Sequence, residues 1–360
     1  MLESRQGERS KNRRNFTAMD PSPTGHLPEL LEELADLLAC PGCGGRLEIL
    51  AERAACADCE THFPVENGIP LLFCPNEWEA GAEDATDRVR EFYERDPFPR
   101  YDDLDSRKSL EEKARRGVFA RLLDEQIPDD WICLEAGCGT GQLTNFLGMS
   151  HRHRVIGADL CLNSLSLAKG FRDQFHINNA AFLQMNLFRP PFRDAAFDFL
   201  LCNGVLHHTS DPYRGFCCLL GKLKPGGVVI VGLYNRFGHL PTLWRRWIFE
   251  RLGQRSHFLD SRLRSDGTNV ERKRSWFRDQ YEHPKESRHS YTEVMHWFDE
   301  NGVDFLMGIP KPDGGAFTED ELLFAAHAPG SRAERWLTEM RMLVSGGRDS
   351  GLFMLVGRKR

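Results

Sequence analysis

The sequence predicts an α/β protein built on a parallel sheet, with a small metal-binding module in front of the sheet. Short apolar segments alternate with helical patterns from residue 131 to residue 234, which is typical of parallel strands joined by crossover helices. Ahead of them stand four cysteines in two pairs, each with two residues between its members. Hydrophobic residues make up 41% of the 360 positions, which is enough for a core and excludes a wholly disordered chain.

Composition also limits the compartment and the partners. No apolar run approaches the roughly 20 residues of a membrane span, and the first 20 residues lack the apolar segment of a secretory signal. We therefore expect a cytoplasmic protein without a membrane segment, whose eleven cysteines are metal ligands or reduced core thiols. The net charge of −6 argues against affinity for nucleic acid over the whole chain, so local basic patches need separate attention.

The four paired cysteines predict a structural zinc site. Cys40 and Cys43 form one knuckle, Cys56 and Cys59 form the other, and twelve residues separate the two. Each Cys-x-x-Cys turn presents two thiolates to one ion, and two turns complete a closed tetrahedral site with no position left for water. The metal would stabilise a module too small to fold on its own core. The alternative, four unrelated core thiols, does not explain the paired spacing.

This segment resembles the small zinc-ribbon activator proteins that partner tRNA, rRNA and protein methyltransferases. The resemblance covers residues 34–73 and depends on the apolar stretch before Cys-Pro-x-Cys, on the second knuckle, and on the run Phe-Pro-Val-Glu-Asn-Gly-Ile-Pro-Leu-Leu at 63–72. The apolar stretch, residues 28–39, has the spacing of one helical stripe. The resemblance implies a fused module that packs on, stabilises or helps to recognise substrate for a methyltransferase, without catalysis by the zinc.

A glycine-rich loop follows the first strand of the predicted sheet. Residues 131–136 are expected to form the strand, Gly-Cys-Gly-Thr-Gly at 137–141 the loop, and residues 142–147 a helix. Glycines permit positive φ and a close backbone approach to a ligand at the carboxyl end of a strand. Asp159 ends the next strand, 22 residues after Gly137, which is close to the spacing of a ribose-binding carboxylate.

The run Leu-Glu-Ala-Gly-Cys-Gly-Thr-Gly-Gln at 134–142 resembles the first motif of the class I S-adenosylmethionine-dependent methyltransferases, and the match continues in order through residue 234. The resemblance implies a Rossmann-like class I methyltransferase sheet of the small-molecule branch, with S-adenosyl-L-methionine as cofactor. The acidic residue and the glycine loop would hold its methionine part, Asp159 its ribose and Leu160 its adenine, while Asn186 replaces the usual Asp. The full set of implied cofactor residues is Glu135, Gly137, Cys138, Gly139, Gly141, Asp159, Leu160, Asn186, Leu187 and Asn203.

Two histidines are the candidate catalytic residues. His207 and His208 come directly after the fourth strand, at the edge where ligands bind, and one of them is a candidate base for a hydroxyl or acidic-carbon acceptor. The alternative is a packing role beside the cofactor. No Asn-Pro-Pro-Tyr follows the fourth strand, which disfavours methylation of the exocyclic amine of a nucleobase or of glutamine. No Pro-Cys or Thr-Cys nucleophile stands at the expected strand end, which argues against methylation of pyrimidine carbon 5 through a covalent adduct.

An insertion after the fifth strand leaves two interpretations of the substrate open. Residues 236–290 hold thirteen Lys/Arg and seven Asp/Glu, interleaved with aromatic residues. They are either a lid whose aromatic residues pack over the site or a basic surface with stacking platforms for RNA. As a lid, the insertion would select a compact acceptor, and Arg272, Lys273 and Arg274 would attract an anionic one. The aromatic run at 92–101 would close over the cofactor from the other side.

The sequence therefore predicts a methyltransferase acting on oxygen, nitrogen or carbon of a small or carrier-bound metabolite. An RNA base methyltransferase and a non-catalytic cofactor-binding scaffold are the alternatives, and the oligomeric state is not predicted. The predicted parts are a flexible tail over 1–27, a zinc-ribbon domain over 28–76, a linker and helical lid segment over 77–127, and the methyltransferase domain over 128–360 with its insertion at 236–290.

Overall fold

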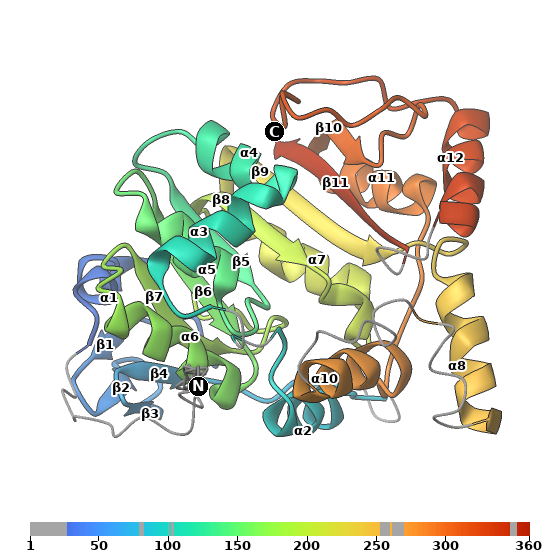
Figure 1. The fold of residues 1–360 in the computed structure, drawn as a ribbon. Coiled ribbons are helices and arrows are strands. Elements are labelled where there is room, and N and C mark those ends of the chain that lie inside the picture. Colours follow the sequence, from blue (N-terminus) through green and yellow to red (C-terminus); the bar gives the residue numbers. More distant parts are fainter. Residues whose placement is uncertain are drawn as a thin grey trace, which may run out of the picture.

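A computed structural model describes most of the chain (Figure 1). The described residues are 27–78, 83–99, 101, 104–252, 260, 270–345 and 351–360. Nearly all of the predicted flexible tail and the middle of the insertion therefore lie outside the described residues. Within the described part, no helix is long and apolar enough to cross a membrane.

One sheet runs through the described residues, with the strand order β1-β2-β3-β4-β7-β6-β5-β8-β9-β11-β10. Strands β7, β6, β5, β8 and β9 pair in parallel, and β11 joins β9 and β10 in antiparallel pairing, so the predicted parallel sheet with an antiparallel end is confirmed. The strands are β1 Leu47–Ile49, β2 Arg53–Cys56, β3 His62–Glu66, β4 Ile69–Leu72, β5 Ile132–Ala136, β6 Arg154–Asp159, β7 Ala180–Met185, β8 Phe197–Asn203, β9 Leu223–Tyr234, β10 Val303–Ile309 and β11 Leu352–Lys359.

Helices cover both faces of the central strands. One apolar cluster joins one sheet face to α1, α7 and α11, and a second joins the other face to α3, α4, α5 and α6. The helices are α1 Glu29–Glu33, η1 Ala35–Leu37, α2 Thr86–Arg95, α3 Arg107–Arg116, α4 Val118–Gln126, α5 Gln142–Met149, α6 Leu162–Gln174, η2 Leu206–His208, α7 Pro212–Leu220, α8 Leu240–Leu252, α10 Val270–Tyr281, α11 Tyr291–Glu300 and α12 Arg332–Ser345.

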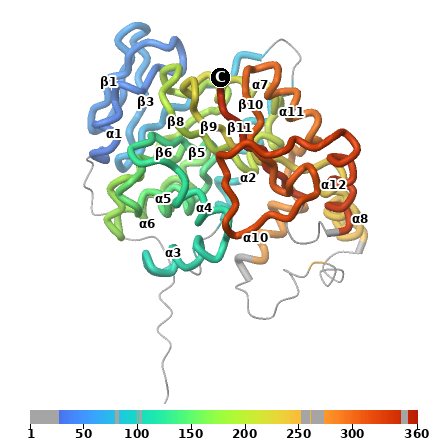
Figure 2. Tube along the Cα trace, turned by 90° about the horizontal axis from the view of Figure 1, so that it is seen from above, coloured from blue at the N-terminus to red at the C-terminus, as the bar shows by residue number. Residues whose placement is uncertain are grey.

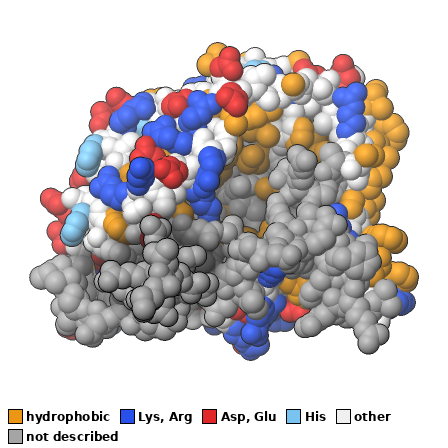
Figure 3. Space-filling view, viewed as in Figure 1, with side chains coloured by type: hydrophobic (Ala, Val, Ile, Leu, Met, Phe, Trp, Pro, Cys, Tyr) orange, Lys and Arg blue, Asp and Glu red, His pale blue; other side chains and the backbone are white. Residues whose placement is uncertain are grey.

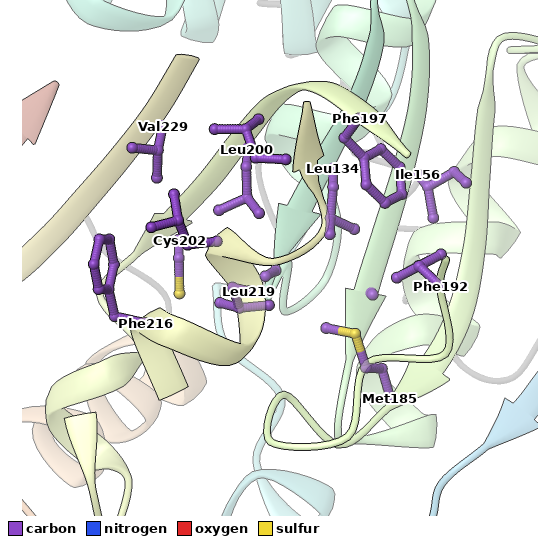
Figure 4. Packing of buried hydrophobic residues seen from close by; sticks show 14 of the residues in the cluster. Leu134, Ile156, Met185, Phe192, Phe197, Leu200, Cys202, Phe216, Leu219 and Val229 are labelled. Atoms are coloured by element: carbon purple, nitrogen blue, oxygen red, sulfur yellow. The ribbon is translucent and has the colours of Figure 1, made fainter. Parts of the chain in front are cut away.

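The central strands are apolar on both faces because both faces are covered. Successive side chains of a strand point to opposite faces, so Leu134 enters the first cluster and Cys133 the second. Leu200 and Val229 likewise enter the first cluster, which Figure 4 shows together with Phe216 of α7. This two-sided burial fixes the register of the strands, and with it the position of every loop at their carboxyl ends.

The N-terminal module is continuous with the main sheet. Its last strand, β4, pairs in parallel with β7 through Leu71–Gln184 and Leu72–Met185, so the module extends one edge of the sheet (Figure 2). The predicted helix over 28–39 is only partly correct, because α1 ends at Glu33 and a 3-10 turn follows. Leu38 is extended and forms a bridge to Phe192, which buries it without a helix.

The described part of the insertion consists mainly of α8 and α10. Phe249 of α8 packs edge-on against Tyr281 of α10, with ring centroids 4.7 Å apart. On its outer side α8 exposes Trp244 and Trp247, with 64% and 52% of their surface accessible. Figure 3 shows hydrophobic side chains gathered along the edge of the molecule where α12 and α8 lie.

Candidate active site

A cavity of about 460 Å³ opens at the carboxyl ends of β5, β6, β7 and β8. Pockets for small ligands have volumes of about 300–1,000 Å³, and in open parallel sheets ligands bind at this edge. One side of the cavity, the strand-end wall, includes Glu135, Gly137, Cys138, Gly139, Asp159, Leu160, Asn186, Leu187 and Asn203. A second group of lining residues, the helical wall, includes Tyr93, Phe98, Tyr234, Trp276, Asp279 and Gln280.

The strand-end wall brings together nine of the ten residues predicted to bind the cofactor. Gly141 is the exception, because it caps the N-terminus of α5 with φ of 68° and faces Phe182. Gly139 has φ of 52°, and a Cβ there would lie 2.4 Å from the carbonyl oxygen of Phe98. A glycine at this position therefore allows the loop to lie close to the backbone that follows α2. It would equally allow the loop to lie close to a ligand.

Asp159 is held in place by the glycine loop. Its Oδ2 accepts the N–H of Gly139 at 2.8 Å, and its Oδ1 accepts the N–H of Cys161 at 2.9 Å. Burial raises the pKa of the carboxyl, while the two backbone donors act in the opposite direction. Each oxygen keeps acceptor capacity toward the cavity, so the carboxylate can receive two hydroxyl groups of a ribose.

Glu135 is a second buried acid on the same wall. The hydroxyl of Thr144 donates to its Oε2, and burial raises the pKa of the carboxyl to about 7. A nearby positive charge on a ligand would favour the ionised form and lower this pKa. No Lys or Arg is among the described lining residues of the cavity, so the acids of the site suit a cationic ligand.

Asn186 connects the strand-end wall to the N-terminal module. Its Nδ2 donates to the carbonyl of Cys74 at 2.9 Å and to Oδ1 of Asn76 at 2.7 Å. Its Oδ1 accepts the N–H of Phe188 at 3.1 Å and keeps one lone pair. The amide nitrogen is thus committed to the module, and only the oxygen can accept a hydrogen bond from an adenine amino group.

Arg189 makes a second connection between this loop and the first cysteine knuckle. Its guanidinium donates to the carbonyls of Pro41 and Gly42, each at 3.0 Å, and to the carbonyl of Pro75 at 3.0 Å. The first two carbonyls lie between Cys40 and Cys43. The geometry of the knuckle is therefore tied to the loop that carries Asn186 and Leu187.

The four cysteines predicted to bind metal lie together. Their sulfur atoms are all within 4.8 Å of one another, with Cys40 to Cys59 at 3.7 Å and Cys43 to Cys56 at 3.5 Å. A tetrahedral zinc with Zn–S bonds of about 2.3 Å places its sulfurs about 3.8 Å apart, so the four thiols fit the ion. None of the four forms a disulfide, and in the described part of the chain no other such cluster of ligands occurs.

The two candidate catalytic histidines are buried and bonded to each other. His208 lines the cavity and His207 lies behind it, with their Nε2 atoms 3.1 Å apart. Nδ1 of His208 faces the carbonyl of Lys285 at 3.0 Å and must carry the proton, so its Nε2 accepts from His207. Nδ1 of His207 in turn accepts the N–H of Tyr234 at 3.3 Å.

These partners leave neither neutral histidine with a free basic nitrogen. Burial lowers the pKa of His208, and burial together with the neighbouring histidines lowers the pKa of His207 well below its usual value. His207 also stacks on Tyr234 with ring centroids 3.9 Å apart. The pattern corresponds to the packing role considered as the alternative, and the base role of either residue stays a prediction.

The helical wall is assembled from segments almost 190 residues apart. The hydroxyl of Tyr93 on α2 donates to Oδ1 of Asp279 on α10 at 2.8 Å. Asp96 pairs with Arg278, whose guanidinium carbon also lies 4.9 Å above the ring of Phe92. Three residues of α10, within the insertion, and Phe98 of the aromatic run at 92–101 line the cavity, and the role of the insertion as a lid stays a prediction.

Three residues of this wall were missed by sequence reasoning. Asp279 and Gln280 stand in a basic, polar helix, and Tyr234 ends a strand whose other residues are core. The only signal was helical spacing, since Trp276, Asp279 and Gln280 share one face of α10. The predicted attraction of an anionic acceptor is not supported, because neither Lys273 nor Arg274 lines the cavity. The side chain of Arg272 lies outside the described residues.

Comparison with known proteins shows which family the central part of the sheet resembles. Residues 134–231 match the family model described as a methyltransferase domain. An uncharacterised protein of Synechococcus sp. is 27% identical over 203 residues, covering 48% of this chain and 47% of that protein. A demethylmenaquinone methyltransferase of Lactococcus lactis is 34% identical over 99 residues, covering 27% of this chain and 39% of that protein.

A tRNA U34 carboxymethyltransferase of Campylobacter curvus is 29% identical over 98 residues, covering 27% of this chain and 32% of that protein. The chain thus spans half or less of the length of these relatives, and their names include both small-molecule and tRNA substrates. The family match covers the strands and loops that build the strand-end wall. The chain contains a class I S-adenosylmethionine-dependent methyltransferase domain, preceded by a four-cysteine cluster.

Proposed function

We propose that this methyltransferase acts on a small or carrier-bound metabolite. The observation that carries the proposal is the lining of the cavity, which extends from the glycine loop to Tyr93 of α2 and to the buried Asp279 and Gln280 of α10. Tyr93 and Asp279 join the two helices across that end. An acceptor that reaches the helical wall has to fit within this space, which favours a compact molecule or a slender arm.

We propose that the strand-end wall holds S-adenosyl-L-methionine. Asp159 would bind the ribose hydroxyls, Glu135 and the loop at 137–139 the methionine part, and Leu160 and Leu187 the adenine. Bound S-adenosyl-L-methionine supplies an electrophilic methyl group on a sulfonium. The protein aligns the acceptor with that group and excludes water, and such positioning can contribute about 7–11 kcal/mol at best.

The four cysteines are assigned to zinc with a structural role. All four positions of a tetrahedral ion are filled by thiolates, so no position is left for a substrate or a water. The metal would stabilise the first knuckle, whose carbonyls receive the Arg189 guanidinium. Through that residue the module supports the loop after β7.

A product-tracing experiment tests the proposed function. The protein is incubated with methyl-labelled S-adenosyl-L-methionine and a cell extract separated into metabolite, RNA and protein fractions. Label is expected in the metabolite fraction, or in a carrier protein from which mild hydrolysis releases it in a small molecule. Label confined to RNA would overturn the proposal, and cofactor binding without transfer to any fraction would indicate the non-catalytic scaffold.

The second candidate is an RNA methyltransferase, which a feature of α8 favours. Trp244 and Trp247 are exposed on this helix, and the Arg251 guanidinium carbon lies 3.9 Å from the centre of the Trp247 ring. Exposed aromatic rings with arginine form stacking platforms for bases.

Salt dependence separates this candidate from the first. If tRNA is the substrate, log Kd should rise steeply with log salt, and Trp247→Ala should weaken binding by about 1–3 kcal/mol. Trp336→Ala on α12 is the matched control, since both tryptophans are 52% exposed. Weak tRNA binding that both variants leave unchanged would remove the RNA candidate.

A further inference from the structure

The acceptor end of the cavity contains a buried carboxylate that the cofactor does not need. Asp279 is 6% exposed and lines the cavity from α10. Its Oδ1 accepts from the Tyr93 hydroxyl and its Oδ2 from Nε2 of Gln280, each at 2.8 Å. These donors fix the carboxylate while leaving each oxygen able to accept a further hydrogen bond.

Gln280 adds a second acceptor beside this carboxylate. Its Nε2 donates to Asp279 and to the hydroxyl of Tyr234 at 3.1 Å, which identifies the nitrogen end of the amide. Its Oε1 is buried and has no hydrogen-bond partner among the described residues. Buried polar atoms are nearly always paired, and Gln280 lines the cavity, so an N–H or O–H of a ligand beside Gln280 would supply the missing partner.

Charge excludes one class of acceptor and admits another. Asp279, Glu135 and Asp159 line the cavity, none of its described lining residues is Lys or Arg, and burial lowers the pKa of His208, which disfavours its charged form. A carboxylate or phosphate on the acceptor would meet only like charge near Asp279. A neutral or positively charged group would not.

The surrounding rings favour a flat or cationic group. Tyr93, Phe98, Tyr234 and Trp276 all line this end of the cavity. Aromatic faces stack on aromatic ligands and attract ammonium groups. Burial raises the pKa of Asp279, which makes the carboxylate a better proton acceptor than an exposed one.

We propose that Asp279 and Gln280 bind the methyl acceptor through its N–H or O–H, so that the acceptor is an amine or a phenol. The inference depends on the proposed function, since it names the acceptor class of the same site. The nitrogen or oxygen forms a bond to the methyl carbon as the carbon–sulfur bond breaks, and the sulfur keeps that electron pair. The acceptor's proton passes to an oxygen of Asp279 and then to water. An amine that binds as the ammonium ion gives up one proton before the methyl transfer, because an ammonium nitrogen has no lone pair.

Three probes of similar size test the proposal without turnover. Benzylamine, 4-methylphenol and benzoate share one ring and differ in the group that they present. Their dissociation constants are measured by ligand-observed NMR on the full chain saturated with S-adenosyl-L-homocysteine. Benzylamine and 4-methylphenol are expected to bind at least tenfold more tightly than benzoate, a ranking that needs no variant.

Two variants test whether Asp279 causes the ranking of the three probes. Asp279→Asn should weaken benzylamine and 4-methylphenol at least tenfold and should not weaken benzoate. Asp299→Asn, an exposed aspartate on α11, is the control and should change none of the three. Benzoate binding as tightly as the other two, or an Asp279→Asn variant that keeps the wild-type ranking, would overturn the proposal.

The outcomes also separate this proposal from the proposed function. If the probes rank as expected but no small molecule is methylated, the proposed function fails and the acceptor site stands. If a small molecule is methylated on a carboxylate, or the probes do not rank as expected, the inference fails alone.

Discussion

The two walls of the cavity enclose the same space but arise in different ways. The strand-end wall is made by loops that directly follow β5, β6, β7 and β8, and much of its chemistry comes from backbone N–H groups and glycine conformations. The helical wall consists mainly of side chains of α2 and α10, joined by Phe98 after α2 and by Tyr234 at the end of β9. The two helices meet only through tertiary contacts such as Tyr93 to Asp279.

This difference explains what each wall can do. A wall built from strand ends is fixed by the register of a two-sided core, so it suits a cofactor that is the same in every turnover. A wall built from two helices can change its side chains without disturbing the sheet, so it suits the selection of an acceptor.

Loss of the metal should have the largest effect. Zinc contributes about 10–16 kcal/mol to small four-ligand modules, so Cys43→Ser should lose the bound ion and lower the unfolding temperature of the N-terminal module. Because Arg189 and Asn186 contact this module, cofactor affinity should also fall, by roughly tenfold for the loss of one or two hydrogen bonds.

Elemental analysis and calorimetry check this prediction, with Cys217→Ser on α7 as the control. Freshly purified, chelator-free protein should contain about one zinc per chain, as a single four-thiolate site requires. Protein that contains no metal would contradict the assignment. Unchanged cofactor affinity in metal-free protein would contradict the inference that the N-terminal module supports the strand-end wall.

The Asp159→Ala substitution should cause the second largest effect, a loss of cofactor affinity. It removes the acceptor for ribose and leaves the N–H groups of Gly139 and Cys161 without their partner, so cofactor affinity should fall about 100-fold or more. Calorimetric titration with S-adenosyl-L-homocysteine measures the change. Asp279→Asn on the helical wall should stay within about threefold of wild type, a difference below 1 kcal/mol. Equal losses in the two variants would contradict the division of the cavity.

Gly139→Ala should disturb both walls at once. The added Cβ would meet the carbonyl oxygen of Phe98 at 2.4 Å, and φ of 52° is unfavourable for alanine. We expect a loss of about 1–3 kcal/mol in the free energy of unfolding, measured by chemical denaturation. Gly170→Ala on α6 is the control, because a Cβ added there would have no neighbour within 4 Å and alanine favours helix. Equal stability of the two variants would show that the contact with Phe98 is dispensable.

The pH dependence of cofactor binding should be the smallest effect. Burial raises the pKa of Glu135 to about 7 in the absence of ligand, and a cationic ligand binds the ionised form better. Affinity for S-adenosyl-L-methionine should therefore rise by up to roughly tenfold between pH 6 and pH 8, and level off above. Glu135→Gln should remove most of this dependence. A wild-type affinity that falls with rising pH would contradict the sign.

Nine of the ten predicted cofactor residues line one cavity, because the features that place them are local. The glycine loop, Asp159 and the alternating apolar residues lie in short segments whose backbone conformation follows from their own sequence. The site differs where distant contacts decide it. The amide nitrogen of Asn186 donates hydrogen bonds to Cys74 and Asn76, and no local sequence pattern predicts these two contacts.

The helical wall could be predicted only in outline. Aromatic spacing indicated that the insertion covers a surface, but the partner of Asp279 is Tyr93, 186 residues earlier in the chain. The two histidines followed a strand at the ligand edge, as catalytic residues do, yet their hydrogen bonds depend on Lys285 and Tyr234 from elsewhere. The position of a residue along the chain indicates that it lies near a site. Its hydrogen bonds to distant residues decide which of its atoms remain free to act on a ligand.

One measurement tests the central claim, that the strand-end wall holds the cofactor and the helical wall receives the acceptor. It is an experimental structure of the full chain with S-adenosyl-L-homocysteine bound. We expect ribose hydroxyls on Asp159, adenine beside Leu160 and Leu187, and the sulfur facing Asp279 across an open space. A ligand bound elsewhere, or a sulfur turned away from α2 and α10, would contradict it.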